Sequence, residues 1–85
     1  MAKHVKLKVA ERKLGREKRV GQYWSDKRLV EIDPRQKPKE HLDTLVHEVL
    51  HDAIPSFSER RINAVSRAVS RVLWAQSYRK VIGVK

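Results

Sequence analysis

The 85-residue sequence predicts one small α+β domain, in which a sheet of about three strands, including an antiparallel pair, packs on two C-terminal helices. Three observations predict this class. Apolar and polar residues alternate near the N-terminus, two runs rich in β-branched and aromatic residues follow, and apolar residues recur every three or four positions after Pro38. The expected parts of domain 1–85 are a basic strand and charged segment (1–19), a β-hairpin (20–34), two helices (38–54 and 57–76) and a tail (77–85).

The N-terminal strand is predicted from three apolar residues at alternate positions, Val5, Leu7 and Val9, which give a strand one solvated face. Residues 11–19 are mostly charged and fit either a short helix or a solvated loop. A hairpin is expected from Val20–Trp24 and Leu29–Ile32, because the polar segment between them suits a short connection. Pro34 stops the second of these strands.

The first helix is predicted from Pro38, a residue that suits a first helical turn, to about Ala53. Its apolar positions are Leu42, Leu45, Val46, Val49, Leu50 and Ala53. Pro55 ends this helix, and a second one opens at Ser56–Glu59 and runs to about Gln76. The apolar positions of the second helix are Ile62, Val65, Val69, Val72 and Leu73.

Composition limits the function classes. The chain has no cysteine, which excludes disulfides, thiolate zinc ligands and cysteine nucleophiles. It has no apolar stretch of about 18 residues and no apolar segment typical of a secretory signal, so we expect a soluble, cytoplasmic protein without a membrane partner. The formal charge of +10 favours polyanions through counterion release, or simply keeps a small protein in solution.

The sequence His47-Glu48-Val49-Leu50-His51 is an HExxH motif inside the more regular of the two helices. Residues four apart on a helix point about 40° apart, so both imidazoles can reach one metal ion. Glu48 lies roughly 100° from His47 and can flank the ion without binding it. On the helical wheel the two histidines border the apolar arc, which leaves them beside the core. The pattern predicts a Zn²⁺ site with Glu48 as general base.

A catalytic zinc normally has a third protein ligand, and beyond His51 the only charged candidates are Asp52 and Glu59. Asp52 turns about 100° away from His51, whereas an antiparallel return would bring Glu59 over the histidines. We therefore expect His47, His51 and Glu59 to bind the metal. The alternative for Glu59 is a capping box with Ser56, which needs no metal. His41 and His4 are the remaining candidate ligands.

Residues 21–74 resemble the small HExxH proteins of bacteria and phages, on the gluzincin-like side of the zincins, whose broader relatives are the ImmA/IrrE and SprT-like metallopeptidases. The shared parts are a hairpin ending at Ile32-Asp33, the helix Leu42-x-x-Leu45-x-His47-Glu48-x-x-His51, and a helix that begins with Glu59. The third downstream histidine of the SprT-like pattern is missing here.

The resemblance implies a minimal zincin-like peptidase, a hydrolase whose edge strand receives an extended peptide or protein substrate. His47, His51 and Glu59 would then bind Zn²⁺, and Glu48 would be the general base. A transition-state oxyanion would need a further hydrogen-bond donor, and no one of the candidates is favoured over the others: Tyr23, Tyr78, Arg60 and Arg61. Trp24 and Trp74 are expected to cover the core or an edge.

Two other function classes compete with the peptidase. Three arginines of the second helix lie within about 40° of one another, Arg60, Arg67 and Arg71, and such a stripe near aromatic residues can bind nucleic acid. The same stripe also fits an ordinary solvated helix face. In the other class the protein is a non-catalytic interaction module in which the metal joins two helices. The sequence does not determine the oligomeric state.

Overall fold

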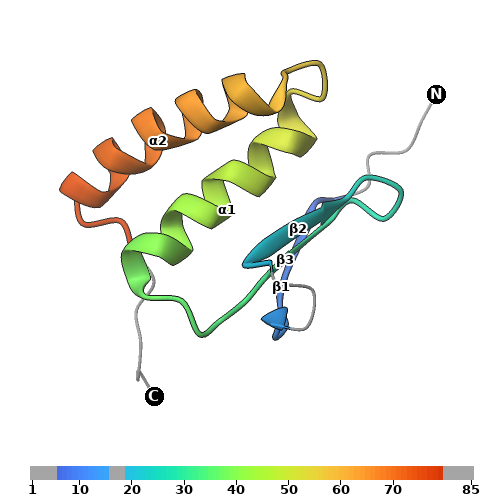
Figure 1. The fold of residues 1–85 in the computed structure, drawn as a ribbon, viewed down its shortest axis with the longest axis horizontal. Helices are drawn as coiled ribbons and strands as arrows, with labels where there is room; N and C mark the ends of the chain where they lie inside the picture. The colour runs from blue at the N-terminus through green and yellow to red at the C-terminus, as the bar shows by residue number, and fades with distance from the viewer. Residues whose placement is uncertain (1–5, 16–18, 80–85) are drawn as a thin grey trace.

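A computed structural model describes residues 6–15 and 19–79 and contains three strands and two helices (Figure 1). The elements are β1 (Lys8–Glu11), β2 (Gly21–Trp24), β3 (Leu29–Ile32), α1 (Pro38–Ala53) and α2 (Glu59–Ala75). The structure thus confirms the predicted α+β class, with a small sheet followed by two helices. The second helix begins at Glu59, two residues later than expected.

The sheet is mixed, with strand order β1-β3-β2. The predicted hairpin is present, because β2 pairs antiparallel with β3 in the register Gly21 to Ile32 and Trp24 to Leu29. Arg28 in the connection adopts a left-handed backbone with φ of 47°, which lets the chain reverse within four residues. β1 pairs parallel with β3, so β1 and β2 form the two edges of the sheet.

β1 differs from the expected half-buried strand. A strand does form, but all four of its residues are exposed, and Val9 keeps 50% of its surface accessible. The physical reason is the position of α1, which packs on β2 and β3 and leaves β1 without cover. Val5 lies outside the described residues. The predicted strand is therefore confirmed. The predicted burial is wrong for Val9, whereas Leu7, directly before the strand, is half-buried.

The charged segment after β1 is fixed by one apolar residue. Leu14 is completely buried, and its backbone N–H donates to Asp33 Oδ2 at 2.9 Å. Arg12 N–H also donates to the carbonyl of Ile32 at 3.0 Å. These bonds hold residues 12–15 against the end of β3, so the segment follows the sheet without extending it.

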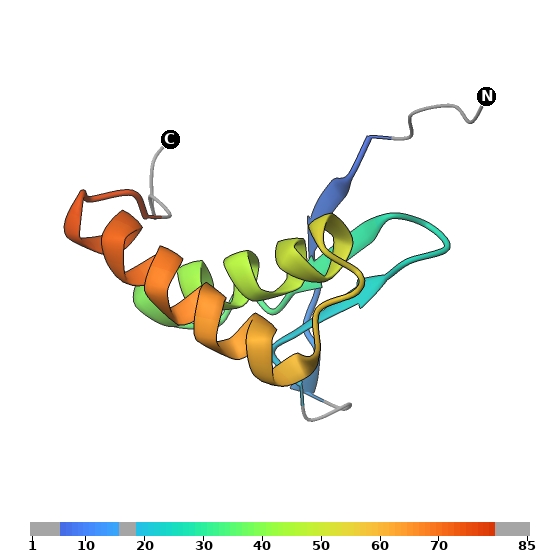
Figure 2. The same cartoon turned by 90° about the horizontal axis from the view of Figure 1, so that it is seen from above.

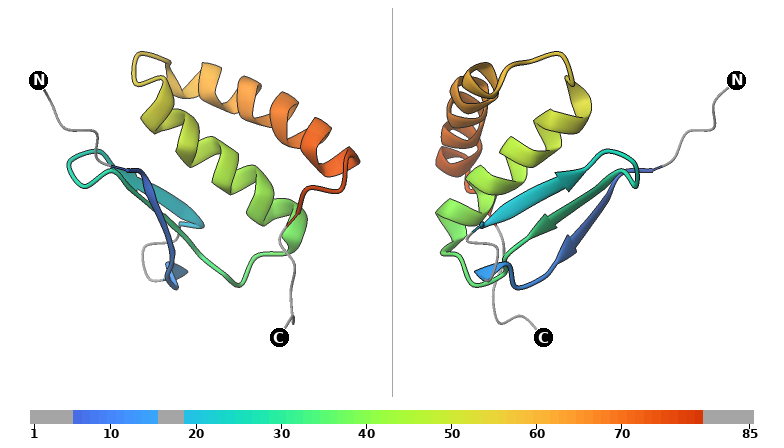
Figure 3. Two further views of the ribbon diagram at one scale, coloured as in Figure 1. Left: turned by 180° about the vertical axis from the view of Figure 1, so that it is seen from behind. Right: turned by 45° about the vertical axis from the view of Figure 1, so that its right-hand side comes forward.

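α1 is the central layer, with the sheet on one side and α2 on the other (Figures 1 and 3). Figure 2 shows the two helices running side by side in opposite directions, with the sheet at the end where α2 begins. Among the described residues, the buried apolar side chains come from the sheet, from the segment after β1 and from both helices: Leu14, Val30, Ile32, Leu42 and Ile62. The core is thin, as expected for a chain of this length.

The seam between the helices contains small polar residues. Ser66 and Ser70 are buried on α2, and Ser70 Oγ donates to Asp43 Oδ1 of α1 at 2.9 Å. Val69 and Val72, which the apolar pattern of α2 placed toward the core, remain 40% and 62% exposed. On the helical wheel Val69 and Val72 lie about 60° and 120° from the buried Ser66, both in the same direction, so they fall on one flank of the seam.

Among residues 6–15 and 19–79, neither helix has the length and apolar character needed to cross a membrane.

Two carboxylates, Glu31 in β3 and Asp33 directly after it, accept hydrogen bonds from arginine side chains. Arg12 donates from Nε to Glu31 Oε2 at 3.1 Å, and this bond, aided by Gln22 and Trp24, lowers the pKa of Glu31 to about 2. Arg35 binds Asp33 through two side-chain nitrogens and, with the backbone N–H of Leu14, holds the Asp33 pKa well below its usual range. Both groups favour the folded state in their ionised form.

The lowered pKa of Glu31 predicts acid sensitivity. In the unfolded chain this carboxyl group takes up a proton near pH 4.3, whereas in the folded chain it stays ionised to about pH 2. Its contribution to the free energy of unfolding is present above about pH 4.3 and is lost as the pH falls toward 2. Urea midpoints followed by circular dichroism in EDTA should drop between pH 5 and 2.5, and Glu31→Gln should drop less steeply. An equal slope in the variant would contradict this prediction.

Candidate metal centre

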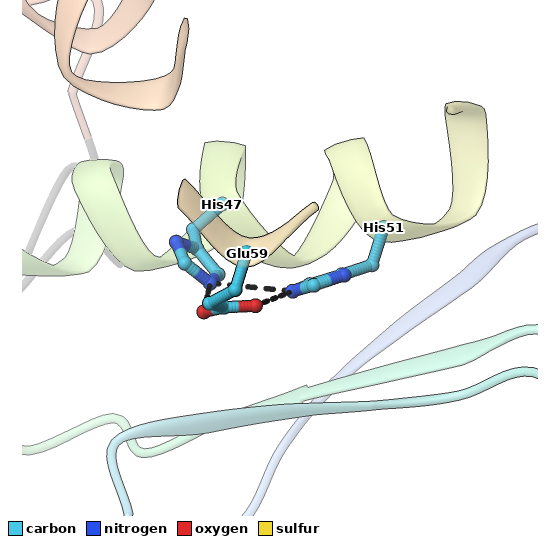
Figure 4. Close-up of side chains that lie close together, drawn as sticks. All are labelled: His47, His51 and Glu59. Atoms are coloured by element: carbon cyan, nitrogen blue, oxygen red, sulfur yellow. Dashed lines mark hydrogen bonds and ion pairs between the residues drawn. The ribbon is translucent and has the colours of Figure 1, made fainter. Parts of the chain in front are cut away.

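The helix spacing and the following turn place three ligand-type side chains together. His47 and His51 lie one turn apart on α1, and Figure 4 shows Glu59 between them, projecting from the first turn of α2. The reversal between the helices is tight, since Ile54 N–H donates to the Leu50 carbonyl at 2.8 Å and Phe57 N–H to the Ile54 carbonyl at 3.0 Å. These local bonds reverse the chain, and α2 then runs antiparallel along α1.

The distances within this cluster, which we call the His–His–Glu cluster (His47, His51 and Glu59), match a metal site. His47 Nε2 lies 2.9 Å from one carboxylate oxygen of Glu59, and His51 Nε2 lies 3.1 Å from the other. The two Nε2 atoms are 3.3 Å apart. Bonds of about 2.0 to 2.1 Å in a tetrahedral zinc site separate ligand atoms by about 3.3 Å. One cation can therefore contact all three groups with little rearrangement.

Capping does not account for Glu59, contrary to the alternative that pairs it with Ser56. The N-cap of α2 is Ser58, whose hydroxyl accepts the Arg61 N–H at 3.2 Å. Glu59 is the first residue of the helix and not the third, so it lacks the position from which a capping-box carboxylate reaches back. Its side chain instead contacts the two histidines.

The other candidate ligands are engaged elsewhere. Asp52 accepts hydrogen bonds from the Tyr23 hydroxyl and from Arg28, whose Nε lies 2.9 Å from Oδ1. His41 is buried, and its Nε2 lies 3.3 Å from Glu11 Oε2 near the end of β1. His4 is outside the described residues. Within the part of the chain that the structure describes, His47, His51 and Glu59 form the one group of at least three metal-ligating side chains.

Glu48 lines the same pocket as the cluster, without joining it. The pocket has a volume of about 370 Å³, and its other lining residues are Arg19, Gly21, Gln22, Tyr23, His47, His51 and Glu59. Burial raises the pKa of the Glu48 carboxyl above its usual value, while the fields of His47 and His51 oppose this shift. A carboxylate with reduced solvation beside an open pocket is suited to accept a proton.

β2 forms the wall of the pocket opposite α1. Asp33 N–H donates to the Val20 carbonyl at 2.9 Å, which makes this a hydrogen-bonded pair of the antiparallel ladder. The alternation of the ladder then turns the backbone groups of Gly21 and Tyr23 toward the open edge. The pocket thus borders a strand edge that has backbone donors and acceptors for an added strand.

Gly21 sets how closely β2 approaches α1. A Cβ atom at this position would overlap the Thr44 methyl group and would lie 3.2 Å from Glu48 Cγ. The sequence pattern predicts no functional role for Gly21. A glycine inside a predicted strand is the signal that could have indicated such a close approach.

The remaining site candidates lie outside the cluster. Tyr23 lines the pocket, but its hydroxyl donates to Asp52, which raises the Tyr23 pKa and directs the proton away from the histidines. Arg60, Arg61 and Tyr78 are exposed, and Arg61 stacks over Phe57 at 5.6 Å. The structure brings none of these three into the pocket lining.

The two tryptophans have structural neighbours. Trp24 donates from Nε1 to Glu31 at 3.0 Å and covers the end of the sheet, with Lys27 stacked on its ring. Trp74 lies under the Arg79 guanidinium at 3.5 Å from the ring centroid. Neither tryptophan lines the pocket beside the His–His–Glu cluster.

Scans of protein-family models, curated proteins and solved structures each found no match for this chain. The function of this chain is therefore inferred from the geometry of the site.

Replacing Glu59 tests the ligand set. Glu59→Gln keeps the size of the side chain but removes its charge, so we expect zinc affinity to fall by about 100-fold or more, since even outer-shell changes cost 10- to 100-fold. Competition titration against a chromogenic chelator measures this affinity. Glu40→Gln, the same change at an exposed position of α1, is the control and should bind as wild type. Equal affinity for both variants would exclude Glu59 as a ligand.

Replacing Gly21 tests the close approach of β2 to α1. Gly21→Ala should cost about 1 to 3 kcal/mol of stability, because the added methyl group overlaps that of Thr44. Adding Thr44→Ser removes the opposing methyl group and keeps the hydroxyl that bonds Gln36, so the double variant should recover most of the loss. Chemical denaturation of the single and double variants measures both effects. An unchanged stability in Gly21→Ala would contradict the predicted clash.

Proposed function

We propose that this protein is a zinc-dependent metallopeptidase of minimal, zincin-like type. The observation that carries the proposal is the convergence of three ligand groups from two helices beside an open pocket: His47 Nε2 and His51 Nε2 lie 3.3 Å apart, and each lies within 3.1 Å of one of the two Glu59 carboxylate oxygens. The HExxH resemblance of residues 21–74 supports the same assignment.

The donor set favours zinc and a catalytic role. Two imidazoles and one carboxylate are a ligand set of catalytic zinc sites, which keep a fourth position open, whereas structural zinc sites usually close it with a fourth protein ligand. When bound, the ion would polarise a water molecule and a peptide carbonyl and lower the pKa of that water toward 7. The described residues supply three ligands and no fourth in reach, which fits an open position.

Glu48 would act as the general base. Its carboxylate lines the pocket beside the two histidines and can take a proton from the attacking water. It can then give that proton to the amine that leaves as the peptide C–N bond breaks, while the hydroxyl group of the water remains on the new carboxyl group. The reduced solvation of Glu48 makes both transfers easier than in an exposed carboxylate.

The open edge of β2 would hold the substrate in an extended conformation. Backbone groups of Gly21 and Tyr23 face this edge, and the pocket with Glu48 lies directly beside it. Gly21 keeps the strand close to α1, which brings an added peptide strand near the metal ligands.

The test compares metal content with hydrolysis. Wild-type protein should bind one equivalent of zinc and cleave a fluorescence-quenched peptide library, and Glu48→Gln should keep the zinc but lose activity by about 10²- to 10⁴-fold. Asp26→Asn, which removes one carboxylate charge at an exposed position between β2 and β3, is the control and should retain activity. Zinc binding without cleavage by the wild type would instead support the non-catalytic, metal-stabilised class, and absence of zinc would overturn the proposal.

A further inference from the structure

The seam between α1 and α2 contains a second pocket, of about 340 Å³, that the proposed catalytic groups do not use. We call it the basic pocket; its lining residues are Lys39, Glu40, Asp43, Arg67, Ser70 and Arg71. Arg67 and Arg71 lie one turn apart on α2, and Lys39 faces them from the first turn of α1. Three cations therefore surround one cavity.

These cations have no partner among the residues that the structure describes. Across residues 6–15 and 19–79, the structure shows no ion pair or side-chain hydrogen bond for Lys39, Arg67 or Arg71, whereas Asp43 in the same pocket accepts the Ser70 hydroxyl. Two guanidinium groups at this spacing can hold a carboxylate between them with paired hydrogen bonds. The basic pocket is thus complementary to an external anionic group.

The basic pocket opens on the same side of the helix pair as the His–His–Glu cluster. On α1, Asp43 lies one turn before His47 and about 40° from it, and on α2, Arg67 lies about 80° around the helix from Glu59. At 1.5 Å per residue these positions are about 6 and 12 Å from the cluster along the helix axes. An extended peptide covers this distance with about two to four residues.

We propose that the basic pocket binds an acidic side chain or terminal carboxylate of the peptide substrate, about two to four residues from the cleaved bond. That the bound peptide is a substrate depends on the proposed peptidase function. The basic pocket itself shares no residue with the His–His–Glu cluster. It assigns the protein a preference for acidic peptides.

A peptide carboxylate fits the basic pocket better than nucleic acid. Glu40 and Asp43 offset two of the three positive charges of the lining, which leaves enough charge for one carboxylate but not for a run of closely spaced phosphates. No aromatic side chain lines it, so bases would find no stacking surface there. Arg60, the third arginine of the predicted nucleic-acid stripe, is not part of the lining.

The first experiment measures binding without requiring catalysis. Fluorescence anisotropy of labelled hexaglutamate, hexaglutamine and a dT12 oligonucleotide would be recorded with the Glu48→Gln protein at fixed salt. Adding Arg67→Gln and Arg71→Gln should weaken hexaglutamate binding by about tenfold or more, as expected for charged hydrogen bonds that contribute at least 1.4 kcal/mol together. The control adds Arg61→Gln on the outer face of α2 and should change binding by less than about twofold.

The loss of hexaglutamate affinity per positive charge removed is compared between the Arg61 control and the pocket variants. An equal loss would show that only the net charge of the protein matters and would overturn the proposal. Tighter binding of dT12 with the same dependence on Arg67 and Arg71 would overturn it in favour of nucleic acid. Unchanged circular dichroism spectra in the variants would confirm that the helices still form.

The second experiment separates this inference from the proposed function. With active protein, kcat/KM should be higher for peptides with Glu two to four residues from the cleaved bond than for the matched Gln peptides, and Arg67→Gln with Arg71→Gln should abolish the difference. Cleavage without such a preference overturns the basic-pocket assignment alone. No cleavage of any peptide, combined with arginine-dependent binding of hexaglutamate, overturns the peptidase proposal and leaves the acidic-ligand assignment supported.

Discussion

The antiparallel return of α2 over α1 is the constraint on which the rest of the structure depends. It buries Ile62 and brings Ser66 and Ser70 into the helix seam. The same return carries Glu59 to His47 and His51, at 2.9 and 3.1 Å. The candidate metal centre therefore assembles only when the two helices pack together. A cation bound by both helices would stabilise the fold by binding only the folded state.

Polar contacts compensate for the thin apolar core at the other face of α1. Asp33 joins the end of β3 to Leu14 through a backbone bond, and Glu31 joins β3 to Arg12 beside β1. Along β2, the Tyr23 hydroxyl reaches Asp52, the residue after His51. The strand edge beside the pocket is thereby fixed to the helix that carries the two histidines of the candidate metal centre, which suits a site whose groups must keep a set geometry.

Local sequence signals predicted the elements and the proximity of His47 to His51. Residue spacing determines the relation of His47 to His51, and Pro38 and Pro55 mark helix boundaries, so these features are readable without tertiary information. The exposure of β1 could not be predicted from the sequence, because the alternation of Leu7 and Val9 does not indicate which strands α1 covers. The cap of α2 was misplaced by two residues, since Ser56 and Ser58 both satisfy the local capping preference. Glu59 was expected from elimination, and its approach to the histidines depends on a helix return that only the folded chain displays.

The central claim is that two imidazoles and one carboxylate surround a single cation. Zinc K-edge X-ray absorption of the protein loaded with one equivalent of zinc tests it most directly. The account predicts four or five nitrogen and oxygen neighbours at about 2.0 to 2.1 Å, with outer-shell scattering from two imidazole rings. A six-oxygen shell without imidazole scattering, as for a loosely bound hydrated ion, would contradict it.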